Sequence, residues 1–154
     1  MSTNNQTYSI GDVAKIMDLS ISTLRYYDKE GLLDNVERTP GGVRIFRDAD
    51  IRQLHMIECL KSSGLPLKDI HTFFQWCKEG DSTIEQRYQM FLDRKAIIEQ
   101  QMADLQNTLD MINYKCEYYR VAKEAGTLNT PRINEIKIVA ANSSDYIKEI
   151  VGED

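Results

Sequence analysis

The sequence predicts a mainly α-helical protein, with a head of four short helices and a β-hairpin followed by one long helix. Three observations support this fold class. Within the first 78 residues, apolar residues recur at helical spacing in short stretches that turn-forming residues separate. A Pro-Gly-Gly sequence lies between two short β-prone runs in residues 34–47. From residue 84 to residue 119, apolar residues alternate at spacings of four and three, which is typical of a coiled-coil helix.

The first two helices are expected close together, at about residues 9–18 and 20–33. Ser9 is predicted to cap the first helix, with Asp12 as its reciprocal acid. Asp18 falls in the turn between the helices, where Asp tolerates a left-handed backbone. The second helix presents short hydroxyls, a guanidinium and a phenol, which can meet phosphates and base edges: Ser22, Thr23, Arg25 and Tyr26. Two such helices joined by a tight turn are typical of a helix-turn-helix.

The hairpin predicted in residues 34–47 has its turn at the Pro-Gly-Gly that begins at residue 40. Asp48 is expected to cap the third helix, and Pro66 to begin the fourth. Four arginines lie within fifteen residues around the hairpin: Arg38, Arg44, Arg47 and Arg52. The net charge of −5 argues against a generally basic DNA-binding surface, but a local patch can suffice.

Ser82 and Glu85 predict a capping box at the start of the long helix, over residues 82–125. One polar residue, Lys95, interrupts its apolar stripe. The apolar members are Ile84, Tyr88, Phe91, Ile98, Met102, Leu105, Leu109, Ile112, Cys116 and Tyr119. At 1.5 Å per residue the stripe would run to about 55 Å, more than the head could bury. Self-association through the stripe is therefore predicted, with an intramolecular hairpin as the alternative.

Residues 126–154 form a short tail, too short for a separate ligand-binding domain. Pro131 and asparagine-rich turns are expected to precede a short helix at about residues 145–151. The tail is apolar enough to pack on another part of the protein, and partial disorder is the alternative.

Two segments resemble the DNA-binding domain of the MerR family: YSIGDVAKIMDLSISTLRYYDKEGLL and RTPGGVRIFRDADIRQL. The resemblance implies a winged helix-turn-helix head at residues 8–78 and a dimerisation helix at residues 82–125, which forms an antiparallel coiled coil with its twin. Several positions depart from the family pattern. Asp18 stands where Gly is usual, Val43 and Phe46 replace the usual aromatic residue and Tyr of the wing, and Pro66 replaces a Ser cap.

The resemblance also implies a transcriptional regulator that binds pseudo-palindromic, double-stranded promoter DNA as a homodimer. It assigns DNA contact to six residues: Ser22, Thr23, Arg25, Tyr26, Arg44 and Arg47. In the implied mechanism, the dimer holds a promoter in which the spacer between the two promoter elements is too long for RNA polymerase. RNA polymerase is thus a partner that acts through the DNA, without direct contact. An effector resets the two heads and distorts the duplex, so that the two promoter elements come into line.

Cys59 is the predicted sensor of the effector. It lies off the apolar stripe of the third helix, on one face with His55 and Arg52. A neighbouring cation would favour the reactive thiolate, whereas the nearby helix C-terminus would disfavour it. The segment MIECLKSSGL resembles a subgroup of the family in which a cysteine here senses aldehydes and other electrophiles. The alternatives are a simply packed Cys59 and a small apolar ligand at the aromatic cluster around Trp76.

Several classes of protein are excluded by what the sequence lacks. Cys77 is predicted to be packed or idle, and Cys116 to pack in the seam of the coiled coil. Three cysteines without a C-x-x-C pair indicate free thiols in a reducing compartment. No cofactor or enzyme activity is predicted, because no phosphate loop, nucleophile elbow or acid–base pair is visible. No metal site is predicted either, because metal sensing usually needs clustered thiolates near the end of the long helix and only Cys116 lies close to it. No run approaches the ~20 apolar residues of a membrane span and no signal peptide is visible, so a cytoplasmic protein is expected. The rival functions are a coiled-coil adaptor and a thiol enzyme acting through Cys59.

Overall fold

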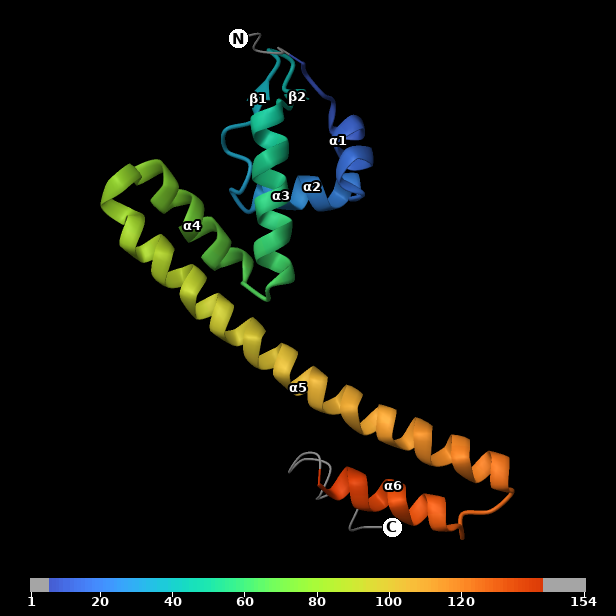
Figure 1. The fold of residues 1–154 in the computed structure, drawn as a ribbon. Helices are drawn as coiled ribbons and strands as arrows, with labels where there is room; N and C mark the ends of the chain where they lie inside the picture. Colours follow the sequence, from blue (N-terminus) through green and yellow to red (C-terminus); the bar gives the residue numbers. More distant parts are fainter. Residues whose placement is uncertain (1–5, 143–154) are drawn as a thin grey trace. The chain divides into compact units, whose positions relative to one another are not determined.

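The computed structural model describes residues 6–142, and the chain falls into two compact units, Met1–Arg94 and Lys95–Asp154. The fold is mainly helical, as the sequence predicts (Figure 1). Its described helices are α1 (Ile10–Met17), α2 (Ile21–Lys29), α3 (Asp48–Ser62), α4 (Leu67–Glu79), α5 (Ile84–Ala125) and α6 (Pro131–Ala141). A short 3-10 helix, η1 (Gly80–Thr83), precedes α5, and β1 (Glu37–Arg38) and β2 (Arg44–Ile45) form a hairpin.

The helices of the first unit enclose one hydrophobic core. Its fully buried side chains come from α1, α2, α3, α4 and the segments between them: Val13, Leu24, Tyr27, Leu32, Phe46, Leu54, Ile57, Leu60 and Ile70. The start of α5 joins this unit. Met90 packs against the core, and the ring of Phe91 meets the edge of Phe73 with centroids 5.5 Å apart. The head therefore includes the first turns of the long helix.

The helix-turn-helix of α1 and α2 is built by local capping, as predicted. The Ser9 hydroxyl accepts a hydrogen bond from the Asp12 N–H at 3.1 Å, and the Asp12 carboxylate accepts one from the Ser9 N–H at 2.9 Å. Asp18 ends α1 with φ 52° and ψ 43°, the left-handed conformation expected in the turn. Ser20 then caps α2, since its hydroxyl accepts a bond from the Thr23 N–H at 3.0 Å.

The second helix is shorter than predicted. It ends at Lys29, four residues before the expected end at residue 33. Gly31 lies beyond that end with φ 76°, a conformation that favours glycine. A Cβ at this position would lie 3.2 Å from Nε2 of His71 in α4, so both the backbone angle and the space favour Gly. The turn brings Leu32 and Leu33 into the core.

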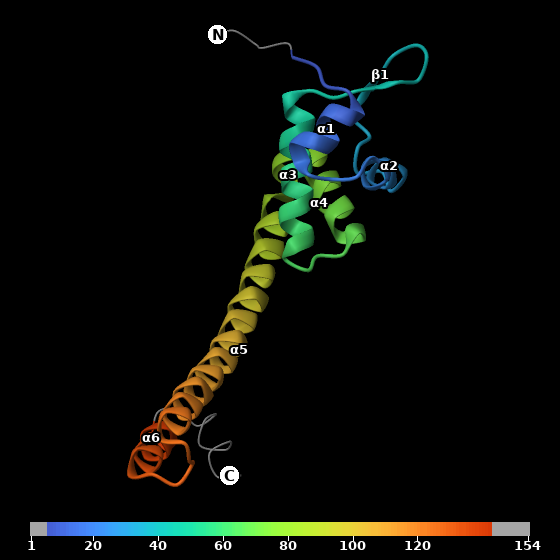
Figure 2. The same cartoon turned by 90° about the vertical axis from the view of Figure 1, so that its right-hand side faces the viewer.

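The wing is a two-stranded antiparallel hairpin in which Glu37 lies opposite Ile45 and Arg38 lies opposite Arg44. Its turn is closed by two backbone hydrogen bonds of 2.8 Å, from the Thr39 N–H to the Val43 carbonyl and from the Gly42 N–H to the Thr39 carbonyl. The predicted turn is therefore confirmed. Figure 2 shows the hairpin loop projecting away from the helices of the head.

Two predicted helix starts were wrong in detail. Asp48 does not cap α3. Its carboxylate accepts the Tyr8 hydroxyl at 2.9 Å, and the Asp50 carboxylate accepts the N–H of Arg47, the N-cap residue, at 2.7 Å. The capping box of Ser82 and Glu85 is replaced by η1. Thr83 is buried and donates its hydroxyl to the carbonyl of Trp76 at 2.5 Å. This bond satisfies one of the carbonyls at the end of α4, which have no partner within the helix.

The second unit contains a helix where turns were expected. Thr130 caps α6 by accepting the Ile133 N–H at 3.2 Å, and Pro131 takes the first helical position, where it suits a helix. Side chains of α6 pack on one face of α5. The buried members are Tyr114, Tyr118, Val121, Ala122, Ile133 and Ala140. The helix predicted at residues 145–151 lies outside the described residues.

The α6 contact does not cover the apolar stripe of α5. Leu105 is 71% exposed and Leu109 49% exposed, and Met102, Ile112, Cys116 and Tyr119 are exposed as well. The alternative of an intramolecular hairpin is therefore realised only on a different face of the helix, and among the described residues of the second unit the stripe stays open. Among residues 6–142, no helix is long and apolar enough to cross a membrane.

Candidate nucleic-acid interface

The outer side of α2 carries the polar residues that the sequence singles out. The Ser20 hydroxyl lies 2.8 Å from the hydroxyls of both Ser22 and Thr23, so three hydroxyls gather at the start of the helix. Ser22 and Arg25 are exposed, and Tyr26 is 48% exposed. A helix N-terminus with clustered hydroxyls suits a phosphate, and an exposed guanidinium one turn on can reach a base edge or the backbone.

The inner side of α2 is fixed to α3 by Tyr27, which is buried, as expected. The Tyr27 hydroxyl donates to Oε1 of Glu58 at 2.5 Å and accepts from Nζ of Lys61 at 3.0 Å. Burial, and then the hydrogen bond to Glu58, raises the pKa of Tyr27 above its usual value. The same contact with Tyr27 raises the pKa of Lys61. The phenol therefore stays protonated and holds the helix in one orientation.

The arginines of the wing are not free cations. The half-buried guanidinium of Arg44 pairs with Asp28 of α2. Arg47, just before α3, reaches back to Glu37 of β1, with Nη2 at 2.9 Å and Nε at 3.2 Å from its carboxylate oxygens. Hydrogen bonding with Arg47 lowers the pKa of Glu37. The predicted DNA contacts of Arg44 and Arg47 did not include these carboxylate partners, which the structure adds.

Arg38 and Asp28 were missing from the predicted site. Arg38 Nη2 donates to Asp28 Oδ2 at 2.9 Å, so this carboxylate accepts hydrogen bonds from Arg38 of β1 and from Arg44 of β2. The available signal was the position of Arg38 opposite Arg44 across the predicted hairpin turn, because like charges directly opposite each other are destabilising and an anion between them relieves the repulsion. No local pattern singles out Asp28 among the acids of the head, since it lies sixteen residues from Arg44.

The third helix has the orientation that the helical wheel predicts. Leu54, Ile57 and Leu60 are buried, whereas Cys59 and His55 are exposed. Exposure does not distinguish Cys59 from the other thiols, however. Cys77, near the end of α4, is exposed, so the packed alternative for it is wrong. Cys116 is exposed in the single chain on the open stripe of α5, and its predicted packing in the seam would require the second chain.

The aromatic cluster adjoins a hollow in the first unit. Phe73 is buried and Trp76 is half-buried beside an open space of about 520 Å³. Its lining mixes apolar and charged side chains: Leu65, Asp69, Trp76, Glu85, Gln86, Gln89, Met90, Asp93 and Arg94. The predicted alternative of a small ligand near Trp76 therefore has a physical space.

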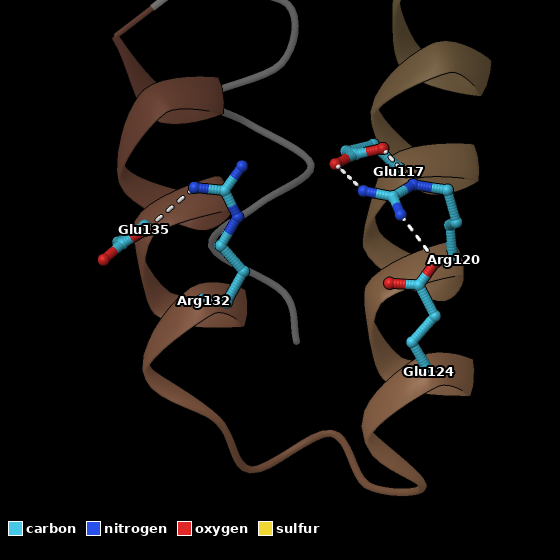
Figure 3. A network of polar contacts seen from close by, with 5 residues as sticks. All are labelled: Glu117, Arg120, Glu124, Arg132 and Glu135. Carbon is cyan, nitrogen blue, oxygen red and sulfur yellow. Dashed lines mark hydrogen bonds and ion pairs between the residues drawn. The ribbon is translucent and has the colours of Figure 1, made fainter.

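The surface of the second unit carries exposed ion pairs along α5 and α6. Arg120 donates to both oxygens of Glu117, at 2.7 and 2.8 Å, and to Glu124 at 2.7 Å, and these bonds raise its pKa (Figure 3). Arg132 donates to Glu135 at 3.1 Å along α6. Such exposed pairs contribute little to stability. Within residues 6–142, no group of three His, Cys, Asp or Glu side chains could hold a metal ion.

Comparison with known sequences places this geometry in a family. Residues 8–76 match the family described as MerR HTH family regulatory protein, and residues 51–114 match the one described as MerR, DNA binding. An uncharacterized HTH-type transcriptional regulator of Haemophilus influenzae is 41% identical over 132 residues, 84% of this chain and 98% of that protein. The regulator AdhR of Bacillus subtilis is 35% identical over 92 residues, 59% of this chain and 66% of its own. These relatives are regulators and not enzymes.

Comparison with solved structures indicates the same family. HiNmlR, a MerR family regulator lacking the sensor domain and bound to promoter DNA, is 40% identical, with a TM-score of 0.74 over 83% of this chain and 99% of that chain. A MerR family regulator from Bacillus thuringiensis is also 40% identical, with a TM-score of 0.65 over 73% of this chain and 98% of its own. The chain therefore belongs to the MerR family and is a DNA-binding transcriptional regulator of the helix-turn-helix type.

Proposed function

We propose that the protein acts in the cytoplasm as a homodimer on double-stranded promoter DNA, and that an effector resets its two heads and distorts the duplex for RNA polymerase. The observation that carries this proposal is the exposed polar side of α2 beside an arginine-bearing wing. HiNmlR, similar along most of its length, was solved bound to promoter DNA. Two discrete dimer states and an effector that prefers one of them would suffice physically.

The proposed contacts divide between the two elements. Ser22, Thr23, Arg25 and Tyr26 extend from α2 and would meet the groove, whereas Arg44 and Arg47 flank the wing and would meet the backbone. Contacts to phosphates fix the register, and contacts to base edges give the sequence preference. The ion pairs of Arg44 and Arg47 do not prevent this, because a guanidinium carries five donors and each pair uses only some of them.

The open stripe of α5 supports the dimer. Regulators of this family bind promoter DNA as dimers, and a second α5 would cover the exposed Leu105 and Leu109. Two-fold symmetry in the protein implies an inverted repeat in the operator. Selection from a random duplex library with the full chain should therefore recover an inverted repeat, and recovery of no preferred duplex would contradict the proposal.

Arg44→Ala should weaken binding both to the selected duplex and to an unrelated duplex. The reason is that a wing contact to a phosphate carries no base information. The slope of log affinity against log salt should fall by about one. Titrations at several salt concentrations measure both quantities. A changed sequence preference with an unchanged slope would instead place Arg44 at a base edge.

The proposed effector is an electrophile such as an aldehyde, acting at Cys59. Its thiol is exposed on α3 with His55 on the same side, clear of the buried stripe. The α3 segment resembles the electrophile-sensing subgroup of the family. Since a thiolate is the attacking form, the surroundings of Cys59 must favour it for sensing to be fast.

Cys59→Ser should leave DNA affinity unchanged and abolish induction of a reporter gene by the electrophile. The residue lies outside α2 and the wing, so only the response depends on its thiol. Mass spectrometry of the unmodified protein should show Cys59 labelled before Cys77 and Cys116, although all three are exposed. Cys77→Ser is the matched control and should respond normally. A normal response from Cys59→Ser would move the effector to the hollow beside Trp76.

A further inference from the structure

One carboxylate joins α2 to both strands of the wing. Oδ2 of Asp28 accepts from Arg38 Nη2 at 2.9 Å and from Arg44 Nε at 3.1 Å, and Arg44 Nη2 also pairs with it. The side chains of Asp28 and Arg44 are only 14% and 22% exposed. Charge-assisted hydrogen bonds that are partly shielded from water are stronger than exposed ones. We call these three residues the Asp28 bridge.

The bridge holds a part of the hairpin that packing does not hold. Glu37, Arg38 and residues 40–43 are exposed, so few apolar contacts fix them. The base of the hairpin is anchored separately, because Phe46 is buried and exchanges two backbone hydrogen bonds of 2.9 Å with Tyr8. Two arginines directly opposite each other would repel without an anion between them. Asp28 removes that repulsion and ties the pair to α2.

The helix end of the bridge is also fixed. Tyr27 locks α2 to α3 through its hydrogen bonds with Glu58 and Lys61. Asp28 follows directly and lies three residues after Arg25, which places both on neighbouring parts of the helix surface. Because α2 is fixed to α3, the bonds of Asp28 fix the position of the wing relative to α2.

We propose that Asp28 is a positioning residue for DNA recognition, which sets the spacing between the wing and the groove-facing side of α2. This inference rests on the proposed binding of duplex DNA by these two elements. A carboxylate beside the DNA weakens the general attraction for phosphates, because it repels them. The same carboxylate keeps Arg25 and the wing arginines in register with one stretch of duplex. Its removal should therefore act in opposite directions on non-specific and specific binding.

The decisive comparison is Asp28→Asn against Glu37→Gln in the full-length dimer. Both changes remove one negative charge from a carboxylate paired with arginine at the wing, but Glu37 pairs with Arg47 and not with α2. The probes are the duplex selected by the wild-type protein and poly(dI-dC). Both variants should bind poly(dI-dC) at least as tightly as the wild type. Asp28→Asn should lose about tenfold in affinity for the selected duplex, and Glu37→Gln should keep it.

Thermal unfolding of each variant separates positioning from loss of fold. If Asp28→Asn does not fold, Arg38→Gln decides, because it removes one arm and keeps the pair of Asp28 with Arg44. It should lower the ratio of specific to non-specific affinity by a smaller factor. Hydrogen exchange of the Thr39 and Gly42 amides should also be faster without the bridge. Equal affinity ratios for Asp28→Asn and Glu37→Gln would overturn the inference alone, whereas failure of the wild type to select any duplex would overturn the proposed function.

Discussion

Replacing Leu105 and Leu109 together by Asp should convert the protein to a monomer and abolish its binding to promoter DNA. Both side chains lie on the open stripe of α5, at 71% and 49% exposure in the single chain. In a dimer they would become buried, and each unpaired carboxylate placed there costs several kcal/mol. With both partners altered, the dimer should weaken by a factor of at least about 1,000. Sedimentation velocity measures the loss directly.

The matched control adds the same charges on the opposite side of the helix. Ala103 and Asn107 are exposed and lie away from the stripe, so Ala103→Asp with Asn107→Asp should keep the dimer. Dissociation of both double variants would show a general effect of charge on α5. A stable dimer of the Leu105 and Leu109 variant would show that the chains associate through another surface.

Arg25→Ala should reduce affinity for the selected duplex by about 10- to 100-fold and relax the preference at one base position. The side chain is exposed on the outer side of α2, and a bidentate contact to a base contributes about 1–3 kcal/mol. A second selection with the variant measures the relaxed preference.

Arg25→Lys tests whether the contact is to a base or to a phosphate. Lysine keeps the charge but lacks the planar fork of the guanidinium, so it should not restore a bidentate base contact. It should restore most of a simple phosphate contact. Recovery of wild-type affinity and preference by Arg25→Lys would therefore reassign Arg25 to the backbone.

The head could be predicted because its signals are local. Ser9, Asp12 and Asp18 act within a few residues of one another, and the Pro-Gly-Gly turn fixes the wing. The Asp28 bridge could not be predicted in the same way, because its arginines lie ten and sixteen residues from the acid. Only folding brings these charges together, and several other acids of the head compete for them in the sequence.

The errors arose where one residue type supports two structures. Pro131 was interpreted as a turn residue, but it follows a capping Thr130 and occupies the first position of α6. At the start of α5, Ser82 fits a capping box, yet Thr83 is buried and bonds to the carbonyl of Trp76 instead. The Thr130 cap is a local signal that the prediction missed, whereas the bond of Thr83 depends on a partner in α4.

If a second α5 covers the open stripe, as we propose, the response of the regulator also depends on its copy number. A surface that is covered only by a second chain links the stability of the fold to protein concentration. While most chains in a cell remain single, the amount of dimer rises with the square of the amount of chain. A twofold change in expression would then change promoter occupancy by up to about fourfold, so the cell could set the sensitivity of the promoter through synthesis alone.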